Sequence, residues 1–178
     1  MKKILTLLLI SLSTIAYSND CGECIVEKAR KEIGVTENGR NNSGTRIAQY
    51  LAHTKIFVPA AWCSSFVSFI LSECGIKHSV NAWSPTATAT NRIYDRRFPK
   101  KNTTEIKAGD VATLFYKNLG RIGHALIIEN PNPNKNYYTT IEGNTNEQGS
   151  RETTTGRDGV FRRKRLKSSI YQISRHCN

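Results

Sequence analysis

One cysteine of this chain stands at the start of a predicted helix, where a thiol is readily activated. Cys63 opens the segment CSSFVSFILSEC, and Gly75 follows it. Apolar side chains recur in this segment at the spacing of one helical face, at Cys63, Phe66, Val67, Ile70, Leu71 and Cys74. Because glycine commonly ends a helix, we predict a helix that begins at Cys63 and stops before Gly75.

The first turn of such a helix suits a reactive thiol. Its backbone N–H groups lack partners within the helix, and the positive end of the helix dipole can lower a cysteine pKa from about 8.5 to roughly 3.5–7.5. The same N–H groups can hold the oxyanion that forms when a thiolate attacks an amide carbonyl. The alternative is that Cys63 is a small buried apolar residue, because free cysteines are among the most buried side chains.

A histidine about sixty residues downstream has the chemistry of the matching base. The segment GDVATLFYKNLGRIGHALIIE predicts two strands around a turn at residues 118–121. His124, Leu126 and Ile128 alternate on one face of the second strand. With an ordinary pKa near 6.5, an imidazole can take a proton from Cys63 and return it to a leaving amine. A lone histidine here is more typical of a core or edge position, and Cys63 upstream favours the catalytic interpretation.

Two polar residues at the end of the next predicted strand are candidates for a third catalytic group. Glu142 and Asn144 flank a glycine in the segment YYTTIEGN. If this strand pairs beside the strand of His124, Glu142 can accept the imidazole N–H and fix its tautomer. The alternative is that Glu142 is a solvated strand terminus, and Asn144 is then the substitute.

Several segments together resemble the CHAP family of cysteine, histidine-dependent amidohydrolases and peptidases. They are AWCSSFVSFIL, GDV, GHALII and IEGNTNEQGSRE with the downstream DGVFRRKR, and the resemblance covers residues 25–173. It implies a papain-like α+β fold, in which N-terminal helices, one with the catalytic cysteine at its N-terminus, pack on an antiparallel sheet that carries the histidine. Cys63, His124 and Glu142 occupy the family's three catalytic positions, and the implied activity is cleavage of peptidoglycan amide bonds.

The same resemblance implies where a substrate would bind. The stretch NNSGTRIAQYL is similar to the family's N-terminal region, which borders the groove, so Asn42 and Tyr50 are candidates for lining it. Trp62, the aromatic residue before the nucleophile, and Asn144 complete the expected substrate-binding set. Ser64 stands where many relatives have alanine, a small change that we expect to leave activity intact.

The N-terminus has the pattern of a secretory signal peptide. Lys2 and Lys3 precede an apolar run over residues 4–15, and the stretch AYS follows, ending at Ser18. The run is shorter than the roughly 20 apolar residues of a membrane span, so we expect cleavage after Ser18 rather than a membrane anchor. The expected signal peptide is thus residues 1–18, and the protein is expected to be periplasmic or secreted. Residues 19–178 suit a single catalytic domain. Along it we expect a helix near residues 25–33, a second near residues 46–53, the Cys63 helix, a long connection over residues 81–98 and then several strands.

Five cysteines in an exported chain cannot all pair internally. On one helix, Cys63 and Cys74 are eleven residues apart, or roughly 16 Å, against a limit of about 7 Å between bridged Cα atoms. If Cys63 is the free nucleophile, three pairings are open to the remaining cysteines, which are Cys21, Cys24, Cys74 and Cys177. We favour a bond from Cys21 or Cys24 to Cys177, and a bond between Cys21 and Cys24 is the alternative.

This chemistry requires neither a metal nor a cofactor. The sequence has no HExxH pair, which argues against a metallo-hydrolase. A zinc site is conceivable by ligand type, but the spacing is not that of a standard zinc finger; its ligands would be Cys21, Cys24, His176 and Cys177.

The chain is strongly basic, with 26 Lys and Arg against 14 Asp and Glu and a formal net charge of +12. The densest cluster is Arg162, Arg163, Lys164 and Arg165. Positive charge attracts polyanions, and we expect peptidoglycan and anionic wall polymers as partners. Nucleic acid ranks last, because export removes the chain from it and no recognition motif appears. A merely solvated basic surface is the alternative, and we expect a monomer.

Our interpretation is an exported cysteine hydrolase of peptidoglycan, either an N-acetylmuramoyl-L-alanine amidase or an endopeptidase of stem peptides and cross-links. Two alternatives keep the same fold and groove. The first is a basic wall-binding protein in which Cys63 is inert. The second is a secreted effector that acts on a protein substrate.

Overall fold

The computed structural model describes residues 21–146 and 157–177. The predicted signal peptide, residues 1–18, lies outside the described residues. Within the described part, no helix is both long enough and apolar enough to cross a membrane.

Three α-helices lie in the first half of the described chain: α1 (Cys21–Lys31), α2 (Thr45–His53) and α3 (Cys63–Glu73). The order and approximate positions agree with the three helices expected from the sequence. Helix α3 begins at Cys63, as expected, whereas α1 begins four residues before the predicted start at residue 25. The extra turn of α1 carries Cys21, which is held by a disulfide bond.

Six strands form one antiparallel sheet in the described residues, in the order β1-β6-β2-β3-β4-β5. They are β1 (Arg92–Asp95), β2 (Val111–Tyr116), β3 (Arg121–Asn130), β4 (Tyr137–Thr145), β5 (Gly159–Leu166) and β6 (Ile170–Ser174). Short 3-10 helices are η1 (Ser84–Thr88), η2 (Pro99–Lys101), η3 (Lys117–Leu119) and η4 (Lys167–Ser169). The α+β class is therefore confirmed. Strand β1 and helix η1 lie in a segment that the sequence predicted only as a long connection.

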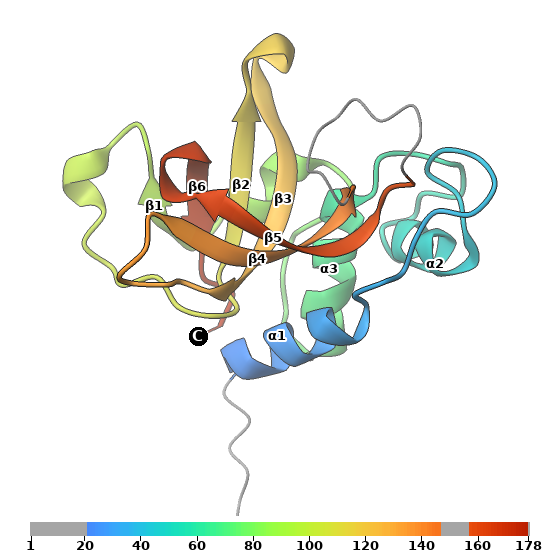
Figure 1. Cartoon of the computed structure of the whole chain (residues 1–178), viewed down its shortest axis with the longest axis horizontal. Helices are drawn as coiled ribbons and strands as arrows, with labels where there is room; N and C mark the ends of the chain where they lie inside the picture. The colour runs from blue at the N-terminus through green and yellow to red at the C-terminus, as the bar shows by residue number, and fades with distance from the viewer. Residues whose placement is uncertain (1–20, 147–156, 178) are drawn as a thin grey trace, which may run out of the picture.

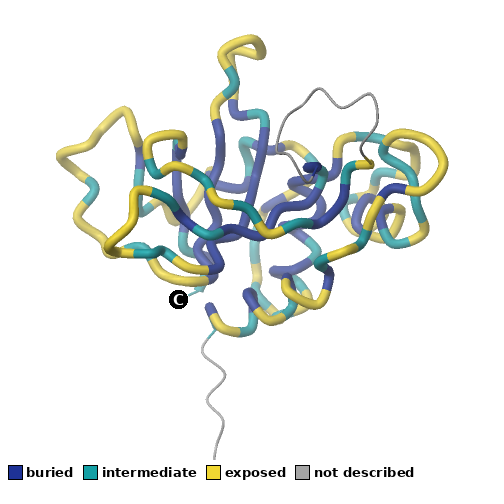
Figure 2. The backbone as a smooth tube through the Cα atoms, viewed as in Figure 1, coloured by how far each residue is buried: buried dark blue, intermediate teal, exposed yellow. Residues whose placement is uncertain are grey.

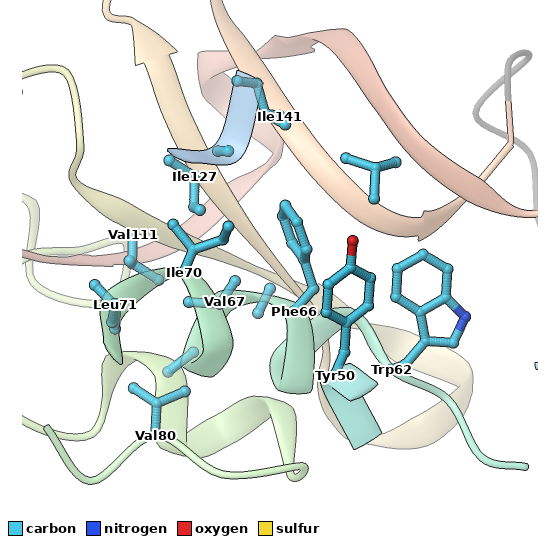
Figure 3. Close-up of a cluster of buried hydrophobic side chains, with 14 of the residues drawn as sticks. Tyr50, Trp62, Phe66, Val67, Ile70, Leu71, Val80, Val111, Ile127 and Ile141 are labelled. Atoms are coloured by element: carbon cyan, nitrogen blue, oxygen red, sulfur yellow. The ribbon is translucent and has the colours of Figure 1, made fainter. Parts of the chain in front are cut away.

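Helix α3 is the element that joins the helices to the sheet (Figure 1). It packs on β3 and β4 and is flanked by α1 and α2. Figure 2 shows that buried backbone concentrates in α3 and the central strands. At the start of α3, the ring of Tyr50 lies 5.6 Å from that of Trp62 and 5.5 Å from that of Phe66, centroid to centroid (Figure 3). This aromatic cluster fixes α2 against the start of α3.

Alternate residues of β3 belong to two different apolar clusters. Ala125 and Ile127 are part of the cluster that includes the buried face of α3. Leu126 and Ile128 are part of a second cluster on the other face of the sheet. The predicted alternation of β3 is confirmed, and His124 has the register of Leu126 and Ile128.

Two disulfide bonds hold α1 to other parts of the chain. Cys21 is bonded to Cys177, and Cys24 is bonded to Cys74 at the C-terminal end of α3, while Cys63 is free. In Figure 1 the C-terminal end accordingly lies beside α1. The favoured link between Cys21 and Cys177 is present. The zinc alternative loses its thiolate ligands, because all three of its cysteines are in disulfide bonds.

Removal of the bond between α1 and α3 should destabilise the fold and leave the free thiol unchanged. The pair Cys24→Ser and Cys74→Ser opens a loop with a sequence separation of 50. For a loop of that length the chain-entropy relation gives about 4 kcal/mol of lost stability. Urea unfolding should show a loss of this order, and thiol titration in denaturant should give one thiol in both proteins. An unchanged unfolding free energy, or extra thiols in the unmodified protein, would contradict this pairing.

Candidate active site

The thiol of Cys63 occupies the first position of α3 and has only 4% of its surface exposed. The preceding carbonyl, that of Trp62, accepts the N–H of Phe66 at 2.9 Å and so begins the helical hydrogen bonds. The N–H groups of the first turn have no partner within the helix, and the helix dipole adds positive potential there. Cys63 therefore lies where negative charge on sulfur is favoured.

A glycine allows α3 to approach β4 closely. A Cβ at Gly143 would come within 2.7 Å of the Trp62 ring and 2.8 Å of the Phe66 ring, so a side chain cannot be accommodated without movement. The next residue, Asn144, accepts the backbone N–H of Trp62 on its side-chain oxygen at 3.0 Å. Together these contacts fix the position of Cys63 relative to β4.

A β-bulge positions His124 on β3. The pairing of β2 with β3 shifts register at Gly123, the residue before His124. Bulges change the direction in which neighbouring side chains point, and they are frequent next to active sites. A Cβ at Gly123 would lie 2.1 Å from the ring of Tyr116, so the bulge requires glycine. The glycine that precedes the histidine in the sequence motif thus has a steric cause.

The carboxylate of Glu142 is fully buried and contacts the imidazole of His124. Its Oε2 atom is 2.9 Å from Nε2 of the ring. Arg165 donates to both oxygens, Nε to Oε1 at 2.8 Å and Nη2 to Oε2 at 2.6 Å, and Thr140 donates its hydroxyl to Oε1 at 2.6 Å. Because Nε2 faces the carboxylate, Nδ1 is the ring nitrogen left to interact with Cys63.

These contacts determine the charges in the site. Burial would raise the pKa of the Cys63 thiol, but the charge of His124, with hydrogen bonds from that ring and from Ser84, lowers it to about 7. Burial likewise opposes a charge on His124, yet Cys63 and Glu142 raise its pKa well above 6.5. Glu142 would also be neutralised by burial, and Arg165 and His124 instead lower its pKa to about 2. The site therefore favours a thiolate and an imidazolium beside an ionised carboxylate.

The structure brings together Cys63, His124 and Glu142 and gives Asn144 a different position. The side-chain amide of Asn144 donates to the side-chain oxygen of Asn42 at 3.1 Å, while its own oxygen accepts the N–H of Trp62 at the start of α3. Of the two candidates for the third group, Glu142 is the one at the imidazole. Asn144 instead binds the backbone at the start of α3.

Tyr50 and Trp62 do not line a groove, which corrects the expectation that they bind substrate. Both side chains are fully buried and stack on one another (Figure 3). The hydroxyl of Tyr50 donates to Glu32 at 2.5 Å, and the indole N–H of Trp62 donates to Glu37 at 3.1 Å. Their large apolar rings fill the interior behind the nucleophile, where they exclude water.

A cavity of about 570 Å³ opens next to the segment that leads into α3. Asn42 belongs to its wall, and none of the described residues that line it is charged. Pro59, also in the wall, precedes Cys63 by four residues, so their Cα atoms are at most about 14 Å apart. At this cavity Phe57 exposes 82% of its surface. The cavity therefore offers an uncharged, partly apolar surface beside the segment that precedes α3.

Two residues at the site were missed by sequence reasoning. Ser84, the first residue of η1, places its hydroxyl oxygen 3.5 Å from the sulfur of Cys63. Arg165 was assigned to a basic surface cluster, but its side chain is only 19% exposed and pairs with Glu142. Strand alternation gave a signal for Arg165. Because successive side chains of a strand point to opposite faces of the sheet, the four basic residues could not all share one face. No pattern in the sequence connected Ser84 with Cys63.

No family model, curated protein or solved structure matches this chain. In the described ranges, no group of three or more His, Cys, Asp and Glu side chains is arranged to hold a metal ion.

Alkylation of Cys63 should follow the low pKa of its thiol. The rate with iodoacetamide, followed by intact mass, should rise with pH through a midpoint near 7, the pKa that the His124 charge gives the thiol. In the His124→Ala protein the midpoint should move to about 8.5 or above, because burial then acts without a compensating charge. A midpoint that is the same in both proteins would show that the imidazole does not ionise the thiol.

Loss of Arg165 should cost far more stability than loss of a neighbouring surface arginine. Arg165→Met leaves the buried Glu142 carboxylate short of a charge partner, which should lower the free energy of unfolding by about 3–5 kcal/mol. Arg162→Met is the matched control, because Arg162 pairs with Glu129 through a side chain that is 51% exposed, and Arg30 pairs with the same carboxylate. Its expected cost is about 1 kcal/mol or less.

The same comparison has a defined pH dependence. The pKa of Glu142 is depressed from 4.5 to about 2 in the folded protein, so its ionised form stabilises the fold above about pH 4.5. That contribution is lost as pH falls from 4.5 towards 2. The gap between the unmodified protein and Arg165→Met, measured by urea unfolding, should therefore narrow over this range. A gap that is constant with pH, or equal to that of Arg162→Met, would contradict the assigned role.

Proposed function

We propose that this protein is a cysteine hydrolase that cleaves amide bonds by attack of the Cys63 thiolate. The observation that supports this most is the buried chain of thiol, imidazole and carboxylate formed by Cys63, His124 and Glu142. The three side chains come from α3, β3 and β4; β3 and β4 are consecutive strands, whereas α3 lies well before them in the sequence and meets them only in the fold.

The proposed reaction uses each member of this chain in turn. The sulfur of Cys63 forms a bond to the amide carbon, and the carbonyl electron pair becomes an oxyanion held by the N–H groups of the first turn of α3. His124 gives its proton to the departing amine as the C–N bond breaks. Water then attacks the thioester and yields its proton to His124, which releases the acid and restores the thiolate. Glu142 keeps the ring oriented and supports its positive charge.

The proposed substrate is peptidoglycan, cut at the N-acetylmuramoyl-L-alanine amide or within the stem peptides and cross-links. The support is the resemblance of the segments around Cys63, His124 and Glu142 to the CHAP family. Two disulfide bonds fit an oxidising compartment, where such a substrate is found, and we propose a periplasmic or secreted location. The uncharged cavity beside the segment that precedes α3 would receive one side of the substrate.

Anionic wall polymers remain proposed partners, with a changed physical basis. The cluster at residues 162–165 does not present four free cations, since Arg162 pairs with Glu129 and Arg165 with Glu142. Attraction to polyanions would come instead from the net charge of +10 that the chain keeps once Lys2 and Lys3 leave with the signal peptide. We propose that the protein is a monomer. We propose no role for nucleic acid.

Digestion of purified peptidoglycan tests the reaction and the bond together. The mature protein should release soluble fragments whose masses identify the amide that is cut. Cys63→Ala should release none, and Glu142→Gln should reduce release by about 10²-fold or more, because the ring loses its anionic partner. Binding to insoluble wall without release by the unmodified protein would instead favour the wall-binding alternative, and an inactive protein that binds no wall would favour a protein substrate.

A further inference from the structure

Ser84 is buried beside the nucleophile. Its hydroxyl oxygen lies 3.5 Å from the sulfur of Cys63, and only 7% of the residue is exposed. Among the residues that the structure describes, no other hydrogen-bond partner of this hydroxyl is recorded. A thiolate can only accept a hydrogen bond, so when Cys63 is ionised the hydroxyl of Ser84 is the donor.

The segment that carries Ser84 is fixed by side chains of α3. The hydroxyl of Ser64 donates to the carbonyl of Asn81 at 2.6 Å, and the hydroxyl of Ser68 donates to the carbonyl of Val80 at 2.9 Å. The side-chain oxygen of Asn81 accepts the N–H of Trp83, the residue before Ser84, at 2.8 Å. Two serines of α3 therefore fix the segment that leads into η1. Ser64, which stands where many members of the CHAP family have alanine, thus makes a hydrogen bond that alanine could not make.

The far end of η1 is fixed as well. The hydroxyl of Thr88 donates to the side chain of Gln172 on β6 at 2.9 Å and lies 3.2 Å from the hydroxyl of Thr113 on β2. All three residues are buried. With both ends held, the Ser84 hydroxyl does not have to reorganise when charge forms on the sulfur. Such preorganised donors stabilise charge most strongly in sites that exclude water.

We propose that Ser84 is a catalytic residue, whose hydroxyl donates a hydrogen bond to the Cys63 thiolate and keeps the nucleophile ionised and aimed. The inference deepens the proposed cysteine chemistry and depends on it. Proton transfer from the thiol to His124 places a negative charge on the sulfur, and the Ser84 O–H donates to that charge. When the sulfur bonds to the amide carbon, its charge passes to the carbonyl oxygen and the hydroxyl is released. Ser84 would thus act before the bond-forming step.

The test is the pH dependence of Cys63 alkylation by iodoacetamide in serine variants, a readout that needs no substrate. Ser84→Ala should move the midpoint upward by about one pH unit, a tenfold loss of thiolate below the midpoint. Ser84→Gly removes the same hydroxyl without adding volume and should give the same shift. Ser84→Thr keeps a hydroxyl, so its alkylation midpoint should lie close to that of the unmodified protein.

Ser65→Ala is the matched control. Ser65 is fully buried in the first turn of α3, and its hydroxyl lies 2.8 Å from that of Thr54, away from the thiol. This variant should leave the alkylation midpoint unchanged. If Ser84→Ala and Ser84→Gly fold, as judged by one titratable thiol in denaturant and a cooperative unfolding transition, and alkylate like Ser65→Ala, the inference is overturned. Peptidoglycan digestion decides the proposed function separately, since a midpoint shift without fragment release would support Ser84 and reject that substrate.

Discussion

A buried carboxylate between two cationic groups governs the chemistry of this site. Glu142 is fully buried, and a buried charge persists only when it is paired and hydrogen-bonded. Arg165 and Thr140 satisfy one side of it, and His124 meets the other. Because the carboxylate stays ionised, the imidazole retains its proton and the thiol of Cys63 is drawn towards thiolate. The charge state of the Cys63 thiol is thus linked, through Glu142 and His124, to an arginine of the edge strand β5.

Position is controlled as tightly as charge. At its N-terminal end, α3 is held against β4 by the close approach at Gly143 and by the hydrogen bond from Trp62 to Asn144. At its C-terminal end, Cys74 is bonded to Cys24 of α1. Three consecutive residues of β4 therefore bind the His124 imidazole, allow the close approach of α3 and accept the backbone N–H at its start. One strand thus sets the position of both the His124 imidazole and the start of α3.

Much of the fold followed from periodicity. Apolar spacing predicted the helix that starts at Cys63 and the alternation in β3, because amphipathic patterns are local and repeat over several turns or residue pairs. The short β1 lacked such a pattern, since its four residues gain their partners from β6 at the far end of the chain. Cys63, His124 and Glu142 were accessible from residue type and local context. The substrate roles given to Tyr50 and Trp62 failed, because an aromatic residue near a nucleophile is equally suited to the core behind it.

The sequence by itself determined the α+β class, the helix that starts at Cys63 and the residue types available for a nucleophile, a base and an orienting group. Only the tertiary structure decided which cysteines pair, that Glu142 rather than Asn144 meets the imidazole, and that Arg165 and Ser84 belong to the site. The physical reason is range. Helices and strands follow from the periodicity of neighbouring residues. Hydrogen bonds and ion pairs in a buried site join residues that are distant in the sequence, and no local pattern predicts which of them meet.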